Sequence, residues 1–398
     1  MIDVWRRQSH PGIGQSPLVN SVSDGVFMAS APQSISIFDL SPEIAALWPE
    51  LTAAIERVLK SGQFVFGPET AAFEREAAEF LGAKHAVAVN SGTDALVIGL
   101  RAMGIGPGDE VVTTPFSFFA SAESISIVGA KPVFVDVELD SMNMDSDLIE
   151  PALTERTKAI MPVHLFGRPC NMDRIMGIAA KHGLEVIEDC AQSFGAPYNG
   201  RMTGTLGKVG CYSFFPTKNL GCYGDGGMLS TDDDALAELA RKLRNHGSIE
   251  RYRNEILGYN SRLDALQAAV LRVKLPHVAS YNEARRAVAQ RYWDLLAPIE
   301  GVVAPEVVPG HVFHQYTIRV LGRDRDAVQA RMKELGVTTM LYYPVPQDRL
   351  PVYAGQYPTF ERNETLSRQV LSLPIWPQIT EDQQRAVADA LARAMRGE

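Results

Sequence analysis

The chain has 398 residues, of which 46% are hydrophobic, and it carries a formal net charge of −9. This length predicts one large domain and a smaller one, with a core large enough to fold without disulfides or a structural metal. The acidic balance argues against nucleic acid and anionic membranes as partners, because no basic excess is available to neutralise their phosphates.

Four cysteines are spread along the chain without Cys-x-x-Cys spacing, and such sparse use is typical of reduced, buried thiols. We therefore expect a cytoplasmic protein without a metal site. No apolar stretch approaches the roughly 18 residues that a membrane-spanning helix needs, and the amino end lacks the apolar core of a signal peptide.

Residues 1–37 are rich in Ser, Gly, Pro and Gln without a sustained period, which predicts a loosely ordered leader. The folded part is expected to begin near Phe38. Ser41-Pro42-Glu43 is typical of a helix start, and a helix to about Lys60 should follow. A second amphipathic helix is predicted over residues 70–81.

The segment from His85 to Leu100 predicts a site for an anion. A short apolar strand, His85 to Val89, runs directly into Asn90-Ser91-Gly92-Thr93-Asp94-Ala95, which opens another helix. A strand, a tight turn and a helix start direct free backbone N–H groups and the positive end of a helix dipole at one point. A phosphate is the ligand that this arrangement favours.

Short strands and helices continue to alternate, which predicts a largely parallel sheet covered on both faces. Ligands then belong at the carboxyl ends of the strands. Glu188-Asp189 lies at such an end, where an acid either serves a ligand or caps the next helix. The expected strands are 110–114, 132–137, 159–163, 184–187 and 228–230, with an aromatic loop at 116–119 and a helix at 172–182.

Lys218 lies in the stretch Ser213-Phe214-Phe215-Pro216-Thr217-Lys218-Asn219-Leu220. Flanking apolar side chains would partly desolvate this lysine and favour the neutral amine that forms a Schiff base with an aldehyde. The alternative is a surface lysine at a turn. The glycine-rich turn 221–227 lacks G-x-G-x-x-G spacing, so its glycines indicate backbone requirements and not a nucleotide fingerprint.

A second domain is expected in the last third of the chain. A long helix is predicted over 281–296, an alternating half-buried strand over 312–320, and helices around Val328 and Leu391. These elements predict a small α/β domain over residues 286–398, after a large domain over residues 38–285.

A partly desolvated lysine, a strand-end acid, a phosphate-type helix start and a loop of phenylalanines are together what pyridoxal phosphate requires. From about Gly67 to Pro377 the chain resembles the DegT/DnrJ/EryC1/StrS family of sugar aminotransferases. This resemblance implies the fold-type I, aspartate aminotransferase-like α/β architecture. The blocks that carry it are Ser91-Gly92-Thr93-Asp94-Ala95-Leu96, Gly108-Asp109-Glu110-Val111, Glu188-Asp189-Cys190-Ala191-Gln192, Ser213-Phe214-Phe215-Pro216-Thr217-Lys218 and Asn260-Ser261-Arg262-Leu263-Asp264.

The resemblance also implies roles for individual residues around pyridoxal phosphate. Lys218 matches the Schiff-base lysine, Asp189 the partner of the ring nitrogen, and Gln192 a residue near the cofactor hydroxyl. Gly92, Thr93 and Ser213 match phosphate contacts. Phe118 matches the aromatic ring against the cofactor face, although the neighbouring phenylalanines are not separated from it by sequence.

Two further blocks bear on partners and substrate. Asn260 matches a phosphate ligand supplied by the neighbouring subunit, with Arg262 near the same site, which implies a homodimer with shared active sites. Asn260 or Ser261 is also a candidate helix cap, and the two interpretations are compatible. Tyr343 and Arg262 are expected near the substrate. After Tyr343-Pro344-Val345-Pro346 the chain reads Gln347-Asp348-Arg349 where many relatives read Leu-His-x-Gln-Pro, so we expect a changed sugar contact there.

The resemblance implies a pyridoxal phosphate-dependent aminotransferase that acts on a nucleotide-linked keto sugar, with glutamate as amino donor, in amino-sugar biosynthesis. One alternative is a sugar dehydratase of the same family, in which histidine replaces the lysine; Lys218 argues against it. The other is a cofactor-binding regulator, which the acidic charge and a leader too short for a DNA-binding module disfavour.

Overall fold

The computed structural model describes residues 34–250 and 252–398. Nearly all of the expected leader therefore lies outside the described residues. Its last part includes Ile35, which is buried and exchanges backbone hydrogen bonds with Gly336 and Thr338 at 2.8 and 2.9 Å. Packed chain thus begins slightly before Phe38, where folding was expected to start.

A seven-stranded sheet has the order β1-β9-β8-β5-β4-β2-β3. Its neighbouring strands pair in parallel, except that β9 is antiparallel to both β1 and β8. The expectation of a mainly parallel sheet is therefore confirmed. The strands are β1 (His85–Val89), β2 (Glu110–Thr113), β3 (Lys131–Phe134), β4 (Thr157–Ile160), β5 (Glu185–Asp189), β8 (Val209–Ser213) and β9 (Gly227–Thr231), and a separate hairpin pairs β6 (Pro197–Tyr198) with β7 (Arg201–Met202).

Helices cover both faces of this sheet. Successive residues of a strand point to opposite faces, and here the side chains on both faces are apolar and must be buried. Val87 and Val89 of β1 pack with α4, α5 and α8, whereas Ala86 and Ala88 pack with α3 and α9 on the other face. The helices of the described residues are α1 (Ser41–Ala46), α2 (Trp48–Ser61), α3 (Pro68–Leu81), α4 (Gly92–Ala102), α5 (Ala120–Ile127), α6 (Ile149–Ala152), α7 (Met172–His182), α8 (Asp234–Leu243), α9 (Ala265–Lys274), α10 (Val278–Leu296), α11 (Arg325–Glu334), α12 (Glu361–Gln369) and α13 (Glu381–Arg396).

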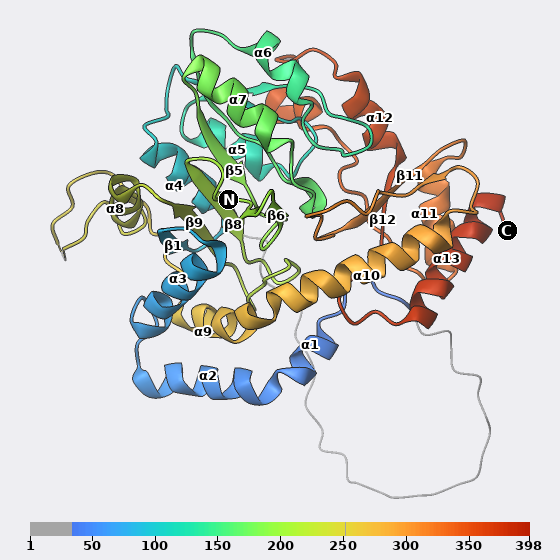
Figure 1. Ribbon diagram of the computed structural model, residues 1–398, viewed down its shortest axis with the longest axis horizontal. Helices are drawn as coiled ribbons and strands as arrows, with labels where there is room; N and C mark the ends of the chain where they lie inside the picture. Colours follow the sequence, from blue (N-terminus) through green and yellow to red (C-terminus); the bar gives the residue numbers. More distant parts are fainter. Residues whose placement is uncertain (1–33, 251) are drawn as a thin grey trace, which may run out of the picture. The chain divides into compact units, whose positions relative to one another are not determined.

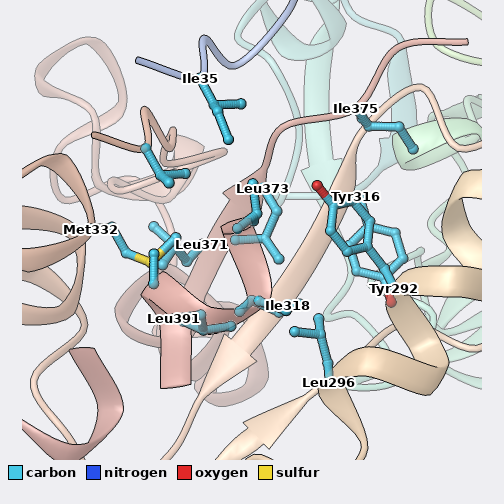
Figure 2. Packing of buried hydrophobic residues seen from close by; sticks show 14 of the residues in the cluster. Ile35, Tyr292, Leu296, Tyr316, Ile318, Met332, Leu371, Leu373, Ile375 and Leu391 are labelled. Carbon is cyan, nitrogen blue, oxygen red and sulfur yellow. The ribbon is translucent and has the colours of Figure 1, made fainter. Parts of the chain in front are cut away.

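A second core forms around the antiparallel sheet β10-β11-β12, with strands β10 (Val302–Val303), β11 (Tyr316–Val320) and β12 (Val370–Leu373). Figure 2 shows Tyr292 of α10 beside Tyr316 of β11, with Leu391 of α13 and Ile35 in the same cluster. The long helix α10 runs from the neighbourhood of α9 to this small sheet (Figure 1). The predicted boundary between residues 285 and 286 falls inside α10 and stays a prediction.

Several element bounds differ from those expected. The helix expected over residues 41–60 is interrupted at Leu47, because Pro49 in the first turn of α2 has no N–H to donate to the carbonyl of Ala45, four residues earlier. The expected strand 312–320 is paired only from Tyr316. Strand β8, which leads to Lys218, was not predicted as a strand. Among the described residues, no helix is both long and apolar enough to cross a membrane.

Candidate active site

A cavity of about 390 Å³ opens at the carboxyl ends of β5 and β8. It contains eight of the ten site residues expected from the sequence, which come from segments more than 250 positions apart. These eight are Gly92, Thr93, Phe118, Asp189, Gln192, Ser213, Lys218 and Tyr343. The remaining two, Asn260 and Arg262, do not line the cavity.

The start of α4 forms one end of the cavity. Ser91 is the N-cap, and its hydroxyl accepts a hydrogen bond from Asp94 N at 3.1 Å, while Gly92 and Thr93 begin the helix. The helix start lies so close to β8 that a Cβ on Gly92 would be 2.6 Å from the Cβ of Ser213. Glycine is therefore required here. The first-turn N–H groups and the Ser213 hydroxyl make this end suitable for a phosphate.

Lys218 lines the cavity and follows the apolar stretch of residues 214–216 in the chain. Burial lowers the pKa of its amine to about 8, and the carboxylate of Asp189 partly opposes this effect. A normal lysine is almost fully protonated at neutral pH, whereas this one keeps an appreciable neutral fraction. The structure thus gives Lys218 the environment of a nucleophile and not of a surface lysine.

Asp189 ends β5 and is only 4% exposed. Its Oδ1 accepts a hydrogen bond from Ala191 N at 3.1 Å, and its Oδ2 accepts one from the hydroxyl of Ser121 at 2.8 Å. Burial raises its pKa, and these two bonds act in the opposite direction. No helix begins directly after Asp189, so the alternative interpretation as a cap of the next helix is wrong.

Gln192 and Tyr343 form another part of the cavity wall. The Oε1 of Gln192 accepts a hydrogen bond from Phe166 N at 2.6 Å, and its Nε2 donates to the hydroxyl of Tyr343 at 3.1 Å. Phe118 lines the cavity at 59% exposure, whereas Phe116 is fully buried and does not line it. Of these two phenylalanines, only Phe118 is placed where it could contact the ring of a bound cofactor.

Asn260 is exposed, and its Oδ1 accepts a hydrogen bond from the guanidinium of Arg262. The N-cap of the following helix, α9, is Asp264. The interpretation in which Asn260 or Ser261 caps that helix is therefore wrong. Ser261 is instead buried, and its hydroxyl binds the side chain of Asn90 at 2.9 Å.

The substituted loop after Pro346 does not reach the cavity. Asp348 is 1% exposed, and its Oδ1 accepts a hydrogen bond from Nδ2 of Asn363 in α12 at 2.9 Å. None of residues 347–350 lines the cavity. Asp348 fixes the loop to α12, and the sugar contact that was expected from this loop stays a prediction.

His314 is a cavity residue that the sequence pattern does not mark. This side chain is buried, its Nδ1 lies 3.2 Å from Oδ1 of Asn219, and burial together with the positive charges of Lys218 and Arg285 keeps its pKa well below the ordinary value. Both hydrogens of the Asn219 amide are donated elsewhere, to Asn282 and to a backbone carbonyl, so its Oδ1 accepts and His314 carries its proton on Nδ1. No local signal could have found this histidine, which precedes β11.

Glu188, next to Asp189, serves the fold. Its buried carboxylate accepts hydrogen bonds from the N–H groups of Gly204, Leu206 and Gly207 at 2.6 to 2.8 Å, and its Oε2 lies 3.0 Å from Nε2 of His164. Nδ1 of His164 accepts from Cys170 N. The ligand atoms of Glu188, His164 and Cys190 lie close enough to share a metal ion, but both nitrogens of His164 are already used.

The cavity combines a partly neutral lysine, a buried carboxylate and a helix N-terminus. This donor set fits pyridoxal phosphate, since an amine, an acid and a phosphate site are its three polar requirements. Lys218, Asp189 and the Gly92-Thr93 helix start would hold it.

Comparison with known proteins supports the same interpretation of the cavity. Residues 47–392 match the family described as the DegT/DnrJ/EryC1/StrS aminotransferase family. The chain is 48% identical to a "pleiotropic regulatory protein" of Geobacillus stearothermophilus, over 91% of this chain and 99% of that protein. It is 46% identical to the UDP-N-acetyl-3-dehydro-alpha-D-glucosamine 3-aminotransferase of Acidithiobacillus ferrooxidans, over 92% and 99%.

A solved structure of DesV from Streptomyces venezuelae, in complex with a ketimine intermediate, superposes with a TM-score of 0.88. It is 44% identical in sequence, and the match covers 91% of this chain and 99% of that chain. The match confirms the fold-type I architecture expected from the sequence. The chain belongs to the DegT/DnrJ/EryC1/StrS aminotransferase family.

Proposed function

We propose that this aminotransferase uses pyridoxal phosphate to move an amino group from glutamate to a nucleotide-linked keto sugar. The observation that carries the proposal is that Lys218, Asp189 and the helix start at Gly92 meet in one cavity. The Acidithiobacillus relative is named for a 3-keto sugar linked to UDP, which makes such sugars the first substrates to test. We expect the reaction in the cytoplasm, where four buried, unpaired cysteines would stay reduced.

The chain's own residues would divide the work as follows. Lys218, with a pKa of about 8, supplies a neutral amine and then accepts and returns a proton at the substrate carbon. Asp189 contributes negative charge at the inner end of the cavity, where it would stabilise a protonated ring nitrogen. Pyridoxal phosphate, when bound, supplies the aldehyde that carries the amino group and the ring that withdraws electrons.

The shared-site homodimer is part of the proposal. Lys218 is the only cavity-lining residue with a positive charge among the described residues, whereas Asp189 and Asp225 are acidic. A cofactor phosphate and a sugar diphosphate would therefore lack cationic partners in one chain. Arg262 with Asn260, on the surface outside the cavity, is the pair that a two-fold partner would supply.

Complementation tests this arrangement. Lys218→Ala and the double variant Asn260→Ala, Arg262→Ala are expected to be inactive alone, and co-refolded heterodimers are expected to recover one intact site. Heterodimers that form without recovery of activity would assign Asn260 and Arg262 to their own chain.

The name of the Geobacillus relative favours a second candidate, a regulator without catalysis. An activity assay distinguishes the aminotransferase from the regulator. Purified protein loaded with pyridoxal phosphate is incubated with glutamate and a panel of UDP- and dTDP-linked keto sugars. We expect production of 2-oxoglutarate and an amino sugar, lost in Lys218→Ala. A label on another lysine after borohydride reduction and peptide mapping, or no turnover with any sugar, would reject the aminotransferase proposal.

A further inference from the structure

Ser121 contacts the buried acid of the site from α5, a helix whose sequence gives no sign of that contact. It lies in the first turn of α5 and is 1% exposed. Its Oγ is 2.8 Å from Oδ2 of Asp189 and 3.0 Å from Oγ of Ser117, and both serines line the cavity. Three polar groups from two segments thus form one chain of hydrogen bonds.

The direction of these bonds follows from the chemistry of the groups. An ionised carboxylate only accepts, so Ser121 must donate its single proton to Asp189. The oxygen of Ser121 then has only lone pairs for its neighbour, so Ser117 donates to Ser121. Each donor therefore polarises the next, and the chain ends on the carboxylate.

Asp189 needs such support because of where it lies. Burial favours its neutral form, and the Ser121 hydroxyl and the Ala191 N–H oppose that tendency. The two bonds engage different oxygens, Oδ2 and Oδ1, which fixes the plane of the carboxylate. A protonated or rotated Asp189 could not stabilise a positive charge on a ligand in the cavity.

We propose that Ser121 is a positioning residue, which, supported by Ser117, orients the Asp189 carboxylate and keeps it ionised in the cavity. The inference rests on the proposed function, in which Asp189 faces the ring nitrogen of pyridoxal phosphate. Loss of the Ser121 hydroxyl would weaken the charge on Asp189 and so lower protonation of that nitrogen.

A purely structural serine is the competing explanation, and α5 contains a matched control. Ser124 is fully buried in the same helix, and its hydroxyl donates to the backbone oxygen of Ser121 at 3.0 Å, without contact to Asp189. Ser124→Ala therefore removes a buried hydroxyl from α5 and leaves the bond to Asp189 in place.

The test measures the protonated fraction of the cofactor ring nitrogen by nitrogen-15 NMR, with labelled pyridoxal phosphate bound to each purified variant. We expect Ser121→Ala to shift the signal from the wild-type position toward that of Asp189→Asn, and to slow the glutamate half-reaction about tenfold. Ser121→Thr, which keeps the hydroxyl, and Ser124→Ala should retain the wild-type signal. Ser117→Ala should give a smaller shift in the same direction. If Ser121→Ala does not fold, the shift in Ser117→Ala is the test of the proposal.

Each outcome decides a separate point. A wild-type signal in both Ser121→Ala and Ser117→Ala, beside a shifted signal in Asp189→Asn, would reduce Ser121 to a packing residue. An equal shift in Ser124→Ala would attribute the effect to general loosening of α5. An unchanged signal in Asp189→Asn would instead remove Asp189 from the ring nitrogen, and the proposed function would need revision.

Discussion

The reactivity of Lys218 should depend on pH in a way that distinguishes it from an ordinary lysine. With a pKa of about 8, about 10% of its amine is neutral at pH 7, against about 0.03% for a lysine with the usual pKa of 10.5. The buried amine is thus about 300 times more available at that pH. Capture of pyridoxal phosphate by the apoenzyme should rise about tenfold per pH unit below pH 8 and level off above it.

Stopped-flow absorbance on mixing apoenzyme with pyridoxal phosphate, from pH 6 to pH 10, measures this profile. Lys218→Ala gives the background from other lysines, and N-acetyl-lysine amide gives the profile of an exposed amine with the same cofactor. Asp189→Asn should move the midpoint to lower pH, because the Asp189 carboxylate raises the pKa of Lys218. A rate that climbs with unit slope through pH 9.5 would show that burial does not perturb this amine.

Three further changes have defined outcomes. Asp189→Asn should lower the rate of the glutamate half-reaction about a hundredfold. Cofactor affinity, measured by fluorescence titration, should change far less, since the phosphate end of the cavity is intact. Similar losses of rate and of affinity would contradict these separate roles. Glu188→Gln should cost about 3 kcal/mol or more in urea unfolding of the apoenzyme, because an amide nitrogen replaces an acceptor of buried N–H groups, whereas the exposed Glu185→Gln should cost under about 0.5 kcal/mol. Asp348→His should lower the melting temperature and slow both half-reactions alike, because it breaks the buried bond to Asn363; a loss confined to the sugar half-reaction would show that the loop contacts the sugar after all.

Local pattern was sufficient for most of the fold, and together with the family resemblance it predicted the residues that meet in the cavity. The strand His85–Val89 and the helix Met172–His182 have the bounds that the sequence predicted, because each is a regular apolar pattern ended by glycine or a capping residue. The rule that ligands bind at the carboxyl ends of parallel strands predicted a ligand site at Asp189, whereas the chemistry of pyridoxal phosphate and the family resemblance placed Lys218 in the same site. The cavity bears out that prediction.

The residues that sequence did not reveal depend on long-range packing. Ser121 bonds to Asp189 across a separation of 68 residues in the chain, and a serine within a helix carries no local sign of such a contact. His314 lies nearly a hundred residues after Lys218, in a segment of a different core. Neither contact follows from a spacing or a period, so only the fold brings these side chains to the cavity.

The substituted loop differs from the pattern of many relatives but does not line the cavity. Gln347 and Asp348 differ from the pattern of many relatives, and a changed sugar contact was the natural interpretation. In the structure both side chains are buried, and Asp348 is bonded to α12 while Tyr343, a few residues earlier, forms the cavity wall. The backbone N–H of Gln347 also donates to Pro115 O at 3.1 Å, next to the loop that carries Phe118. The loop thus follows Tyr343 in the chain and is bonded to the segment before Phe118, so we expect it to change sugar specificity only as far as those two rings move.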